Sequence, residues 1–399
     1  MNLKDLTIAG TDGLTDILVG NERIIAISDA AKSPKGSSAP STGPSLSFDG
    51  AIVFPGLINS HDHLDFNLFP PLANRVYKNY GEWGPDIHRQ NRQEIDAVLK
   101  IPQALRTQWG IYKNLLNGVT TVVNHGERLV TNLSSSGQGD ELIRVFQDCH
   151  CLHSVGFEKN WKWKLNRPFT GTIPFVLHVG EGTDREAEQE IDRLIRWNLF
   201  SKPLIGIHGV AMREDQAKGF RALVWCPVTN FFLLGRTAPV ERLKNRLPIL
   251  FGTDSTLTAG WNIWEHLRSA REQGQLTDKE LMETLTRNPA AVWGLTDHGE
   301  LAPGHVADLV IARPKKGFSG MDAFYHLDPE DILLILQRGR IRLFDASLQD
   351  SLNGGGFATD NFYPVTIGNK SKYVKGDLPG LVKKIREYDA AASLPFTIG

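Results

Sequence analysis

The chain has 399 residues, 41% of them hydrophobic, and its 44 basic and 45 acidic side chains leave a formal net charge of -1. Such a balanced charge creates no broad positive field, which argues against nucleic acid and an anionic membrane surface as partners. The sequence holds no apolar run near the ~18 residues that cross a bilayer, and its start, MNLKDLTIAGTDG, lacks a secretory signal pattern. Because three cysteines cannot form a disulfide framework in so long a chain, we expect a cytoplasmic protein.

Both ends of the chain carry β patterns. Short aliphatic runs predict strands within residues 3–28 and 46–58, and the turn-forming segment AKSPKGSSAPSTGPS, residues 31–45, predicts a loop between them. Strand patterns return after residue 298, in GELAPGHVADLVIAR and ILLILQRGRIRLF. We therefore expect residues 1–54 and 298–399 to form one composite β-sandwich domain, with chain ends that meet.

Residues 55–297 alternate apolar strand-like runs with amphipathic helical patterns, which is typical of an α/β chain with βα units around a parallel sheet. The pattern predicts a (β/α)8 TIM barrel, regular or distorted. Its strand candidates are VFPGLINSH, GVTTVVNH, IPFVLHVGE, LIGIHG, ALVWCP and PILFGTD. Residues 142–157 must supply both strand three and strand four, or else one of the two is irregular, and the register there stays open. Thr183 and Thr277, each followed three residues later by Glu, predict capping boxes at two helix starts.

Four of the candidate strands end in residues that can bind a metal: His61 and His63, His178, His208, and Asp254. The C-terminal ends of parallel barrel strands surround a common site, and alternation along the strand puts His61 and His63 on one face with Asp62 on the other. A single histidine of this kind is ordinarily a packed barrel residue, so only the joint placement indicates a metal. Imidazole with carboxylate suits Zn²⁺ or Fe²⁺ better than Mg²⁺ or Ca²⁺.

The motifs PGLINSHDH, HVGE, IHG, VWCPVTN and FGTDS, with GELAPGHVADLVI, resemble the amidohydrolase superfamily. More closely they are similar to its chlorohydrolase and deaminase branch, which includes guanine, cytosine and S-adenosylhomocysteine deaminases. The resemblance is strongest between residues 175 and 256 and weak from 64 to 170. It implies the barrel with a composite β-sandwich and one divalent metal, held by His61, His63, His178 and Asp254, with His208 beside the metal water. Asp62 departs from the small or aliphatic residue that is commoner at its position.

Glu181 follows His178 by three positions, in the turn that leaves the strand, where its carboxylate can reach a substrate. It could equally be a solvated acid at the start of the next helix, and the resemblance favours the catalytic role. The implied chemistry is attack by metal-activated water, with a proton passing through Glu181 and Asp254 and His208 stabilising the developing charge. We therefore expect hydrolysis of a non-peptide C–N bond, most simply deamination of a small nitrogen heterocycle.

Two alternatives stay open at this point. A carboxylated Lys159, near the end of strand four, would bridge two metals and make the protein a ring-opening cyclic amidase. A barrel that binds metal without turnover is the other, and Glu181 with His208 argues against it. Neither the substrate nor a homo-oligomeric state can be read from the pattern.

Candidates for substrate contact are His125, Trp83 and Asn230, although His125 could instead make a structural hydrogen bond. Tyr77, Tyr80 and Trp83 belong to an aromatic segment that either covers the barrel mouth or, as we favour, packs against the next helix. The run CHCLH, residues 149–153, mimics a second zinc site and is interpreted as a buried strand.

Overall fold

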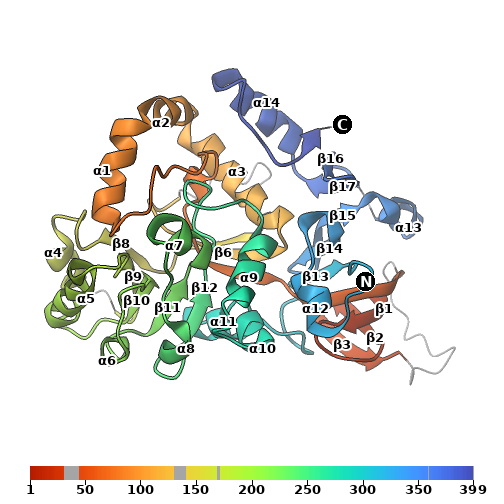
Figure 1. Ribbon diagram of the computed structural model, residues 1–399. Coiled ribbons are helices and arrows are strands. Elements are labelled where there is room, and N and C mark those ends of the chain that lie inside the picture. The colour runs from red at the N-terminus through yellow and green to blue at the C-terminus, as the bar shows by residue number, and fades with distance from the viewer. Residues whose placement is uncertain (31–44, 130–140, 169–170, 358, 399) are drawn as a thin grey trace.

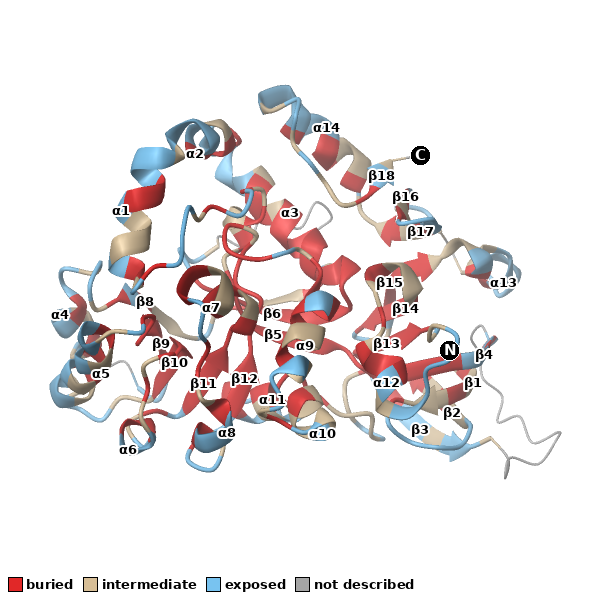
Figure 2. Cartoon of the chain, in the orientation of Figure 1, coloured by how far each residue is buried: buried red, intermediate tan, exposed pale blue. Residues whose placement is uncertain are grey.

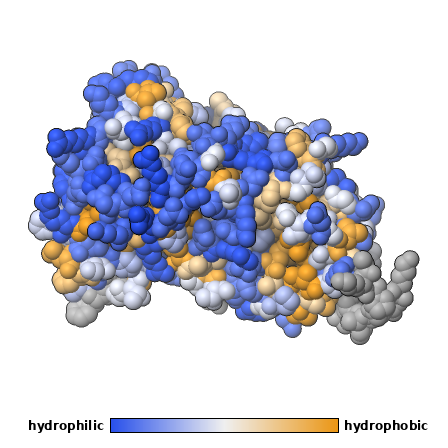
Figure 3. Space-filling view, turned by 60° about the horizontal axis from the view of Figure 1, so that its bottom comes forward, coloured by the Kyte–Doolittle hydropathy of each residue, from blue (hydrophilic) through white to orange (hydrophobic). Residues whose placement is uncertain are grey.

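The computed structural model describes residues 1–30, 45–129, 141–168, 171–357 and 359–398. All but the last residue of the predicted loop 31–45 lies outside the described residues. Barrel and β domain lie side by side in Figure 1. None of the described helices combines the length and apolarity needed to span a bilayer. The face in Figure 3 is largely hydrophilic, with apolar residues in scattered groups.

Parallel strands form the barrel, and each predicted strand is present. They are β5 (Leu57–Asp62), β6 (Val119–Asn124), β7 (Arg144–Phe146), β8 (His150–Ser154), β9 (Phe175–Val179), β10 (Leu204–His208), β11 (Ala222–Trp225) and β12 (Ile249–Phe251). Nearly every residue of these strands is buried except in β7 and β8, which matches the continuous apolar runs of a sheet covered on both faces (Figure 2).

The barrel is distorted, because its strands fall into two sheets. β5, β6 and β7 form one, and β8 to β12 form the other. The seam between β12 and β5 is crossed by a backbone hydrogen bond of 3.1 Å from Asp254 N to His61 O. At the other seam, only residues 147–149 connect β7 to β8, so segment 142–157 supplies both strands without a helix between them.

Helices cover the outside of the barrel (Figure 1): α1 (Tyr80–Gln90), α2 (Arg92–Leu99), α3 (Gln103–Leu116), α4 (Trp161–Leu165), α5 (Arg185–Trp197), α6 (Glu214–Ala217), α7 (Pro227–Leu234), α8 (Val240–Leu243), α9 (Ile263–Glu272), α10 (Asp278–Glu283) and α11 (Arg287–Trp293). Thr277 caps α10 in the predicted capping box with Glu280. At α5 the prediction was wrong by one residue, because the Asp184 carboxylate caps the helix by accepting from Ala187 N at 3.0 Å.

The two ends of the chain combine in one ten-stranded sheet, as expected for the composite β domain. Its order is β18-β16-β17-β15-β14-β13-β4-β1-β2-β3. The strands are β1 (Asn2–Ile8), β2 (Thr15–Gly20), β3 (Arg23–Asp29), β4 (Ser45–Pro55), β13 (Leu309–Ala312), β14 (Ile332–Gln337), β15 (Arg340–Asp345), β16 (Phe362–Ile367), β17 (Lys370–Lys375) and β18 (Thr397–Ile398). Helices α12 (Gly320–Tyr325), α13 (Gln349–Gly354) and α14 (Leu378–Tyr388) complete this part.

The chain ends themselves do not meet, contrary to our expectation. β1 lies inside the sheet beside β4, whereas β18 is the opposite edge strand, with six strands between them. Figure 1 shows the two termini well apart. The physical reason is that the C-terminal strands add successively to the far side of β13 instead of returning to β1.

Candidate metal centre and active site

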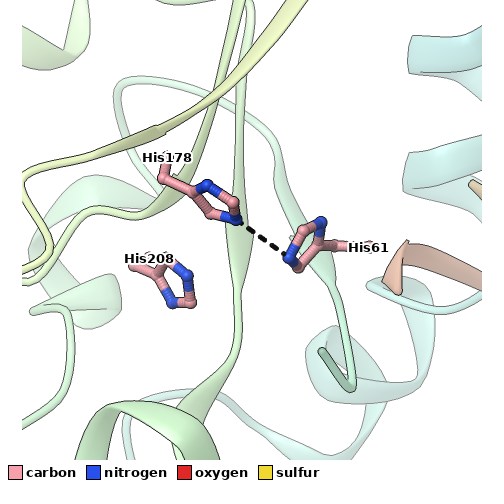
Figure 4. Close-up of side chains that lie close together, drawn as sticks. All are labelled: His61, His178 and His208. Atoms are coloured by element: carbon pink, nitrogen blue, oxygen red, sulfur yellow. Dashed lines mark hydrogen bonds between the residues drawn. The ribbon is translucent and has the colours of Figure 1, made fainter. Parts of the chain in front are cut away.

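The predicted metal-binding residues come together at the C-terminal ends of the barrel strands. His178 Nε2 lies 3.4 Å from His61 Nε2 and 3.3 Å from His63 Nε2. Asp254 Oδ1 lies 3.7 Å from His61 Nε2 and 3.8 Å from His63 Nε2. Figure 4 shows the rings of His61, His178 and His208 converging from three strands. The donor atoms form two overlapping groups, His61–His178–His208 and His61–His63–Asp254, each with its atoms within 4.8 Å of one another.

Sharp turns at the strand ends aim two of these side chains. His208 has φ of 72° and Asp254 has φ of 56°, both in the left-handed region. A non-glycine residue there costs about 1–3 kcal/mol and persists only where its surroundings hold it. The glycine after His208, Gly209, also has a positive φ, 59°. The backbone thus turns abruptly just where the side chains must point over the barrel.

Burial keeps the histidines of the cluster neutral. Desolvation is the main cause that holds the pKa of His61 and His178 well below its ordinary value, and it lowers the pKa of His63 as well. The pKa of His208 falls to about 4, again mainly through burial. Neutral imidazole is the form that binds a metal, so the donors are ready at neutral pH.

Hydrogen bonds made by the Nδ1 atoms fix the ring orientations of His178 and His208. The Nδ1 atom of His178 lies 2.9 Å from the carbonyl oxygen of His153, to which its N–H can donate. His208 Nδ1 makes the same contact, 2.9 Å, with Asn230 Oδ1, and Asn230 donates in turn to Thr237 Oγ1 at 3.2 Å. These bonds leave both Nε2 atoms free to face the centre. Asn230, expected against the substrate, is fully buried behind His208 instead.

The donor set fits a divalent metal ion. Three neutral imidazoles and one carboxylate converge, and this mixture is the one that borderline cations prefer. Asp62, by contrast, points away from the rings into a buried polar cluster, as alternation along the strand predicted.

Glu181 lies beside this centre in the turn after β9. Its Oε2 atom is 3.7 Å from His208 Nε2, and its side chain is buried. Burial, with the nearby Asp254 carboxylate as the second cause, raises the pKa of Glu181 well above its usual range. The solvated acid considered at first is therefore not what the structure contains.

A small cavity of about 70 Å³ opens between the cluster and α1. Its lining is mainly aromatic and polar: His63, Phe66, Tyr80, Trp83, His153, Ser154, Phe157, His178, Glu181, His208, Asp254, Ser255, Leu257 and Thr258. Trp83, a predicted contact residue, lines it, and its Nε1 atom donates to Leu72 O at 2.8 Å. An aromatic wall therefore faces the convergent polar groups.

The aromatic segment before and within α1 packs as we favoured, and part of it also reaches the cavity. Tyr77 is buried and donates to Asp86 Oδ2 at 2.8 Å. Tyr80 donates to Glu190 Oε2 at 2.7 Å and lines the cavity with one edge. Hydrogen bonds to residues of α1 and α5 therefore hold this segment in place.

Two further histidines surround the centre. The ring of His125, a predicted pocket residue, is buried 4.6 Å from that of His178 and 5.3 Å from that of His63, but it is not among the described residues that line the cavity. His153 was missed, because we took it for one more residue of a buried strand. It lines the cavity 5.3 Å from the His178 ring, and burial lowers its pKa to about 4. Its position near the C-terminal end of a barrel strand was the available signal.

The structure does not support a second metal. Lys159 is exposed in the turn that follows β8. A lysine-bridged pair of ions is therefore not formed by the described residues.

Within the described ranges, no group of three donors includes Cys149 or Cys151, and residues His150–Ser154 form a strand as interpreted. The expectation that the run is buried was wrong: among residues 149–153 only Leu152 is buried and His153 is exposed, because β8 is an edge strand of its sheet.

Comparison with known proteins agrees with this geometry. Residues 176–341 match the model of the amidohydrolase family. A 5-methylthioadenosine/S-adenosylhomocysteine deaminase from Desulfitobacterium hafniense is 26% identical over 350 residues, which cover 74% of this chain and 79% of that protein. A zinc-bound adenosine deaminase from Xanthomonas campestris superposes with a TM-score of 0.69 at 16% identity, over 97% of this chain and 98% of that one. The zinc complex of atrazine chlorohydrolase from Arthrobacter aurescens gives 0.64 at 15% identity, over 89% and 99%.

Residues 176–341 thus match the amidohydrolase family, and the relatives that the chain resembles over most of its length are deaminases. Its fold is shared with a deaminase and a chlorohydrolase whose structures contain zinc. The resemblance found in the sequence motifs is confirmed.

Proposed function

We propose that this protein deaminates a small, uncharged nitrogen heterocycle with the help of one divalent metal ion. One observation carries the proposal: a buried carboxyl group, Glu181, lies 3.7 Å from His208 at the edge of the four residues that we propose as metal ligands. A barrel that only bound metal would need no such group.

His61, His63, His178 and Asp254 would hold the ion. Zinc suits three imidazoles and a carboxylate, and ferrous iron accepts the same donors, so metal analysis decides between them. When bound, such an ion acts as a Lewis acid that makes water nucleophilic near neutral pH.

The protein's own groups then move the protons. Because burial raises its pKa and so favours the protonated form, the Glu181 carboxyl group can donate a proton to a ring nitrogen as water attacks the adjacent carbon. The Asp254 carboxylate, fixed by hydrogen bonds from Ser255 N at 2.8 Å and Thr258 Oγ1 at 3.2 Å, can accept a proton from that water. The amino group then leaves as ammonia with the proton that Asp254 took from the water. The hydroxyl proton returns to Glu181, and the ring carbon keeps the oxygen.

His208 has a defined role in this scheme. Its Nδ1–H donates to Asn230, so Nε2 carries a lone pair toward Glu181 and the reacting atoms. In this tautomer the Nε2 lone pair can accept a hydrogen bond from the attacking water or from the Glu181 carboxyl group.

The cavity supports a small, uncharged substrate. Its described lining includes no lysine or arginine, and the Asp254 carboxylate would repel an anion. The cavity of about 70 Å³ is far below the roughly 300–1,000 Å³ of pockets for drug-sized ligands. The faces of Phe66, Trp83 and Phe157 suit a planar ring, so free heterocyclic bases fit better than phosphorylated ones.

The test measures ammonia release by the metal-loaded protein from a panel of free purine, pyrimidine and triazine bases, their nucleosides and their nucleotides. We expect ammonia from at least one uncharged base and none from the nucleotides. A substrate consumed without ammonia would instead indicate ring opening. Full metal occupancy with no turnover of any compound would support a binding role and refute the proposal.

A further inference from the structure

A buried polar cluster lies directly behind His61, in β5, and His63, just after it. Its members are contributed by β5, the turn after it, α3 and the segment after β12: Asn59, Asp62, Asn67, Lys113, Asn114 and Thr253. All six are at most 3% exposed. A lysine and an aspartate so deeply buried are rare in proteins unless they are paired.

Asp62 is saturated by this cluster. Its Oδ2 atom accepts from Lys113 Nζ at 3.0 Å and from Asn114 Nδ2 at 2.7 Å, while Oδ1 accepts from Asn67 Nδ2 at 2.8 Å. The residue between the two histidines is thus held from three sides, by α3 and by the turn that follows β5. Any shift of Asp62 would move His61 and His63 with it, because they are its chain neighbours.

Lys113 links Asp62 to the segment that follows β12. Its ammonium group donates to Asn67 Oδ1 at 2.8 Å and reaches Thr253 Oγ1 and the carbonyl oxygen of Asp254, each at 3.5 Å. Asn59 makes a second link between the same segments: it donates to Thr253 Oγ1 at 2.8 Å and accepts from Thr253 N at 3.1 Å. The cluster therefore ties β5 to the residues after β12.

These ties matter because β5 and β12 belong to different sheets. No ladder of strand hydrogen bonds sets the distance between the two histidines on one side and Asp254 on the other. Asp254 also has a strained, left-handed backbone that its surroundings must hold in place. A buried ion pair seldom stabilises a fold more than apolar residues of the same volume would, so its presence at this seam calls for a positional explanation.

We propose that the Asp62–Lys113 pair is a positioning device that sets the spacing of His61, His63 and Asp254 and thereby the affinity for the metal. The proposal rests on the ligand set proposed above. It assigns Lys113 and Asp62 no contact with the substrate; both act through the residues that they hold.

The test compares three variants with the wild type. Lys113→Met leaves Asp62 buried without its cation. Asp62→Asn combined with Lys113→Met removes both charges and retains one amide oxygen, which can accept from either Asn67 or Asn114. Thr253→Val keeps the charges but removes the hydroxyl group that Asn59 and Lys113 share. Metal affinity is measured by competition with a chelator, the environment of the ion by absorption of the Co²⁺-loaded protein, and stability by Tm.

We expect the single lysine variant to lose both stability and metal affinity. The double variant should recover most of its Tm, yet bind Co²⁺ and Zn²⁺ about 10–100-fold more weakly and with a changed Co²⁺ spectrum, as found when outer contacts of metal ligands are removed. Thr253→Val should weaken binding in the same direction with a nearly unchanged Tm. It is measured in parallel so that a double variant that does not fold leaves the proposal decidable.

A matched control is available in the β domain. Lys372 is also fully buried, with its Nζ atom 2.7 Å from Asp345 Oδ2, and it lies on β17, remote from the metal centre. Lys372→Met should lower Tm without changing metal affinity. Double and Thr253 variants that bind metal within about twofold of the wild type would overturn the proposal. Because every readout is metal binding, a wild-type protein that binds metal but releases no ammonia would refute only the proposed function.

Discussion

The two seams of the barrel differ sharply. At the β12–β5 seam, Asp254 N donates to His61 O and the buried polar cluster fills the space behind the strands. At the β7–β8 seam, the chain passes from one strand to the next through residues 147–149 and leaves a cavity of about 580 Å³. Three of the four proposed ligands lie at the first seam and none at the second. A distorted barrel can therefore keep a rigid centre, provided that the weakly connected seam carries none of the metal ligands.

Removing a ligand from the tight seam should have the largest effect. Asp254→Ala should abolish stoichiometric metal binding and lower deamination on the order of 10⁴-fold or more. The matched carboxylate at the loose seam is the exposed Asp148, and Asp148→Ala should retain the metal and the activity. Metal analysis and ammonia release check both variants. Equal losses in the two would mean that the seams are not functionally distinct.

Glu181→Gln tests the proton transfer without changing any of the four proposed ligands. Loss of the acid should lower kcat by roughly 10²–10⁴-fold, the usual contribution of a general acid or base. Metal content and Co²⁺ spectrum should stay as in the wild type. Glu127→Gln, at the cavity of the loose seam, serves as the control and should be silent. A Glu181 variant with full activity would remove the residue from the mechanism.

Buried carboxylates offer a third contrast, since Asp62 has a cation and Glu190 lacks one. Glu190 Oε2 accepts from Tyr80, and burial, as the largest cause, raises the pKa of Glu190 to about 7. A carboxyl group whose pKa is higher in the folded state adds stability that is fully present below its unfolded pKa and is lost as pH rises through 7. This loss amounts to at most about 3 kcal/mol.

Glu190→Gln should therefore flatten the decline in the free energy of unfolding between pH 5 and 8. Urea unfolding at several pH values measures this free energy, with the metal ion present at a saturating concentration throughout. Tyr80→Phe removes the hydrogen bond from the hydroxyl group and should change the same slope less. Parallel pH profiles for wild type and the glutamine variant would contradict the assignment.

The smallest effect is expected at Asn230. Asn230→Ala removes the acceptor that orients His208 and should lower kcat about 10–100-fold, the range known for outer contacts of metal-site histidines. The metal content should be unchanged, because His208 is not among the four proposed ligands. A loss of metal would show instead that His208 belongs to the ligand set.

The sequence was most informative where chemistry follows local pattern. Alternating apolar runs predicted the barrel strands, and residues at strand ends predicted His61, His63, His178, His208 and Asp254, because parallel strands bring their ends to one rim. The β domain followed from strand patterns at both ends of the chain. In each case a short stretch contains its own signal.

Contacts between distant segments were harder to predict. Lys113 lies in α3, where a lysine ordinarily faces solvent, and only the fold shows that it points at Asp62. His153 was hidden in a segment of alternating residues whose register was open, and Asn230 was assigned to the substrate instead of to His208. Asp184 caps α5 in place of the predicted Thr183; the two are neighbours and both have a side chain suited to the role. Such choices depend on which segments pack together, which periodicity does not encode.

The junction between β4 and β5 has a practical consequence. The two strands are separated by Gly56 alone, where a Cβ atom would lie 2.3 Å from Thr120 Oγ1. A nearly continuous extended segment thus begins in the ten-stranded sheet and ends at His61 and His63. Attempts to excise the barrel for expression by itself should therefore fail, because trimming the leading residues would leave its first strand without an anchor.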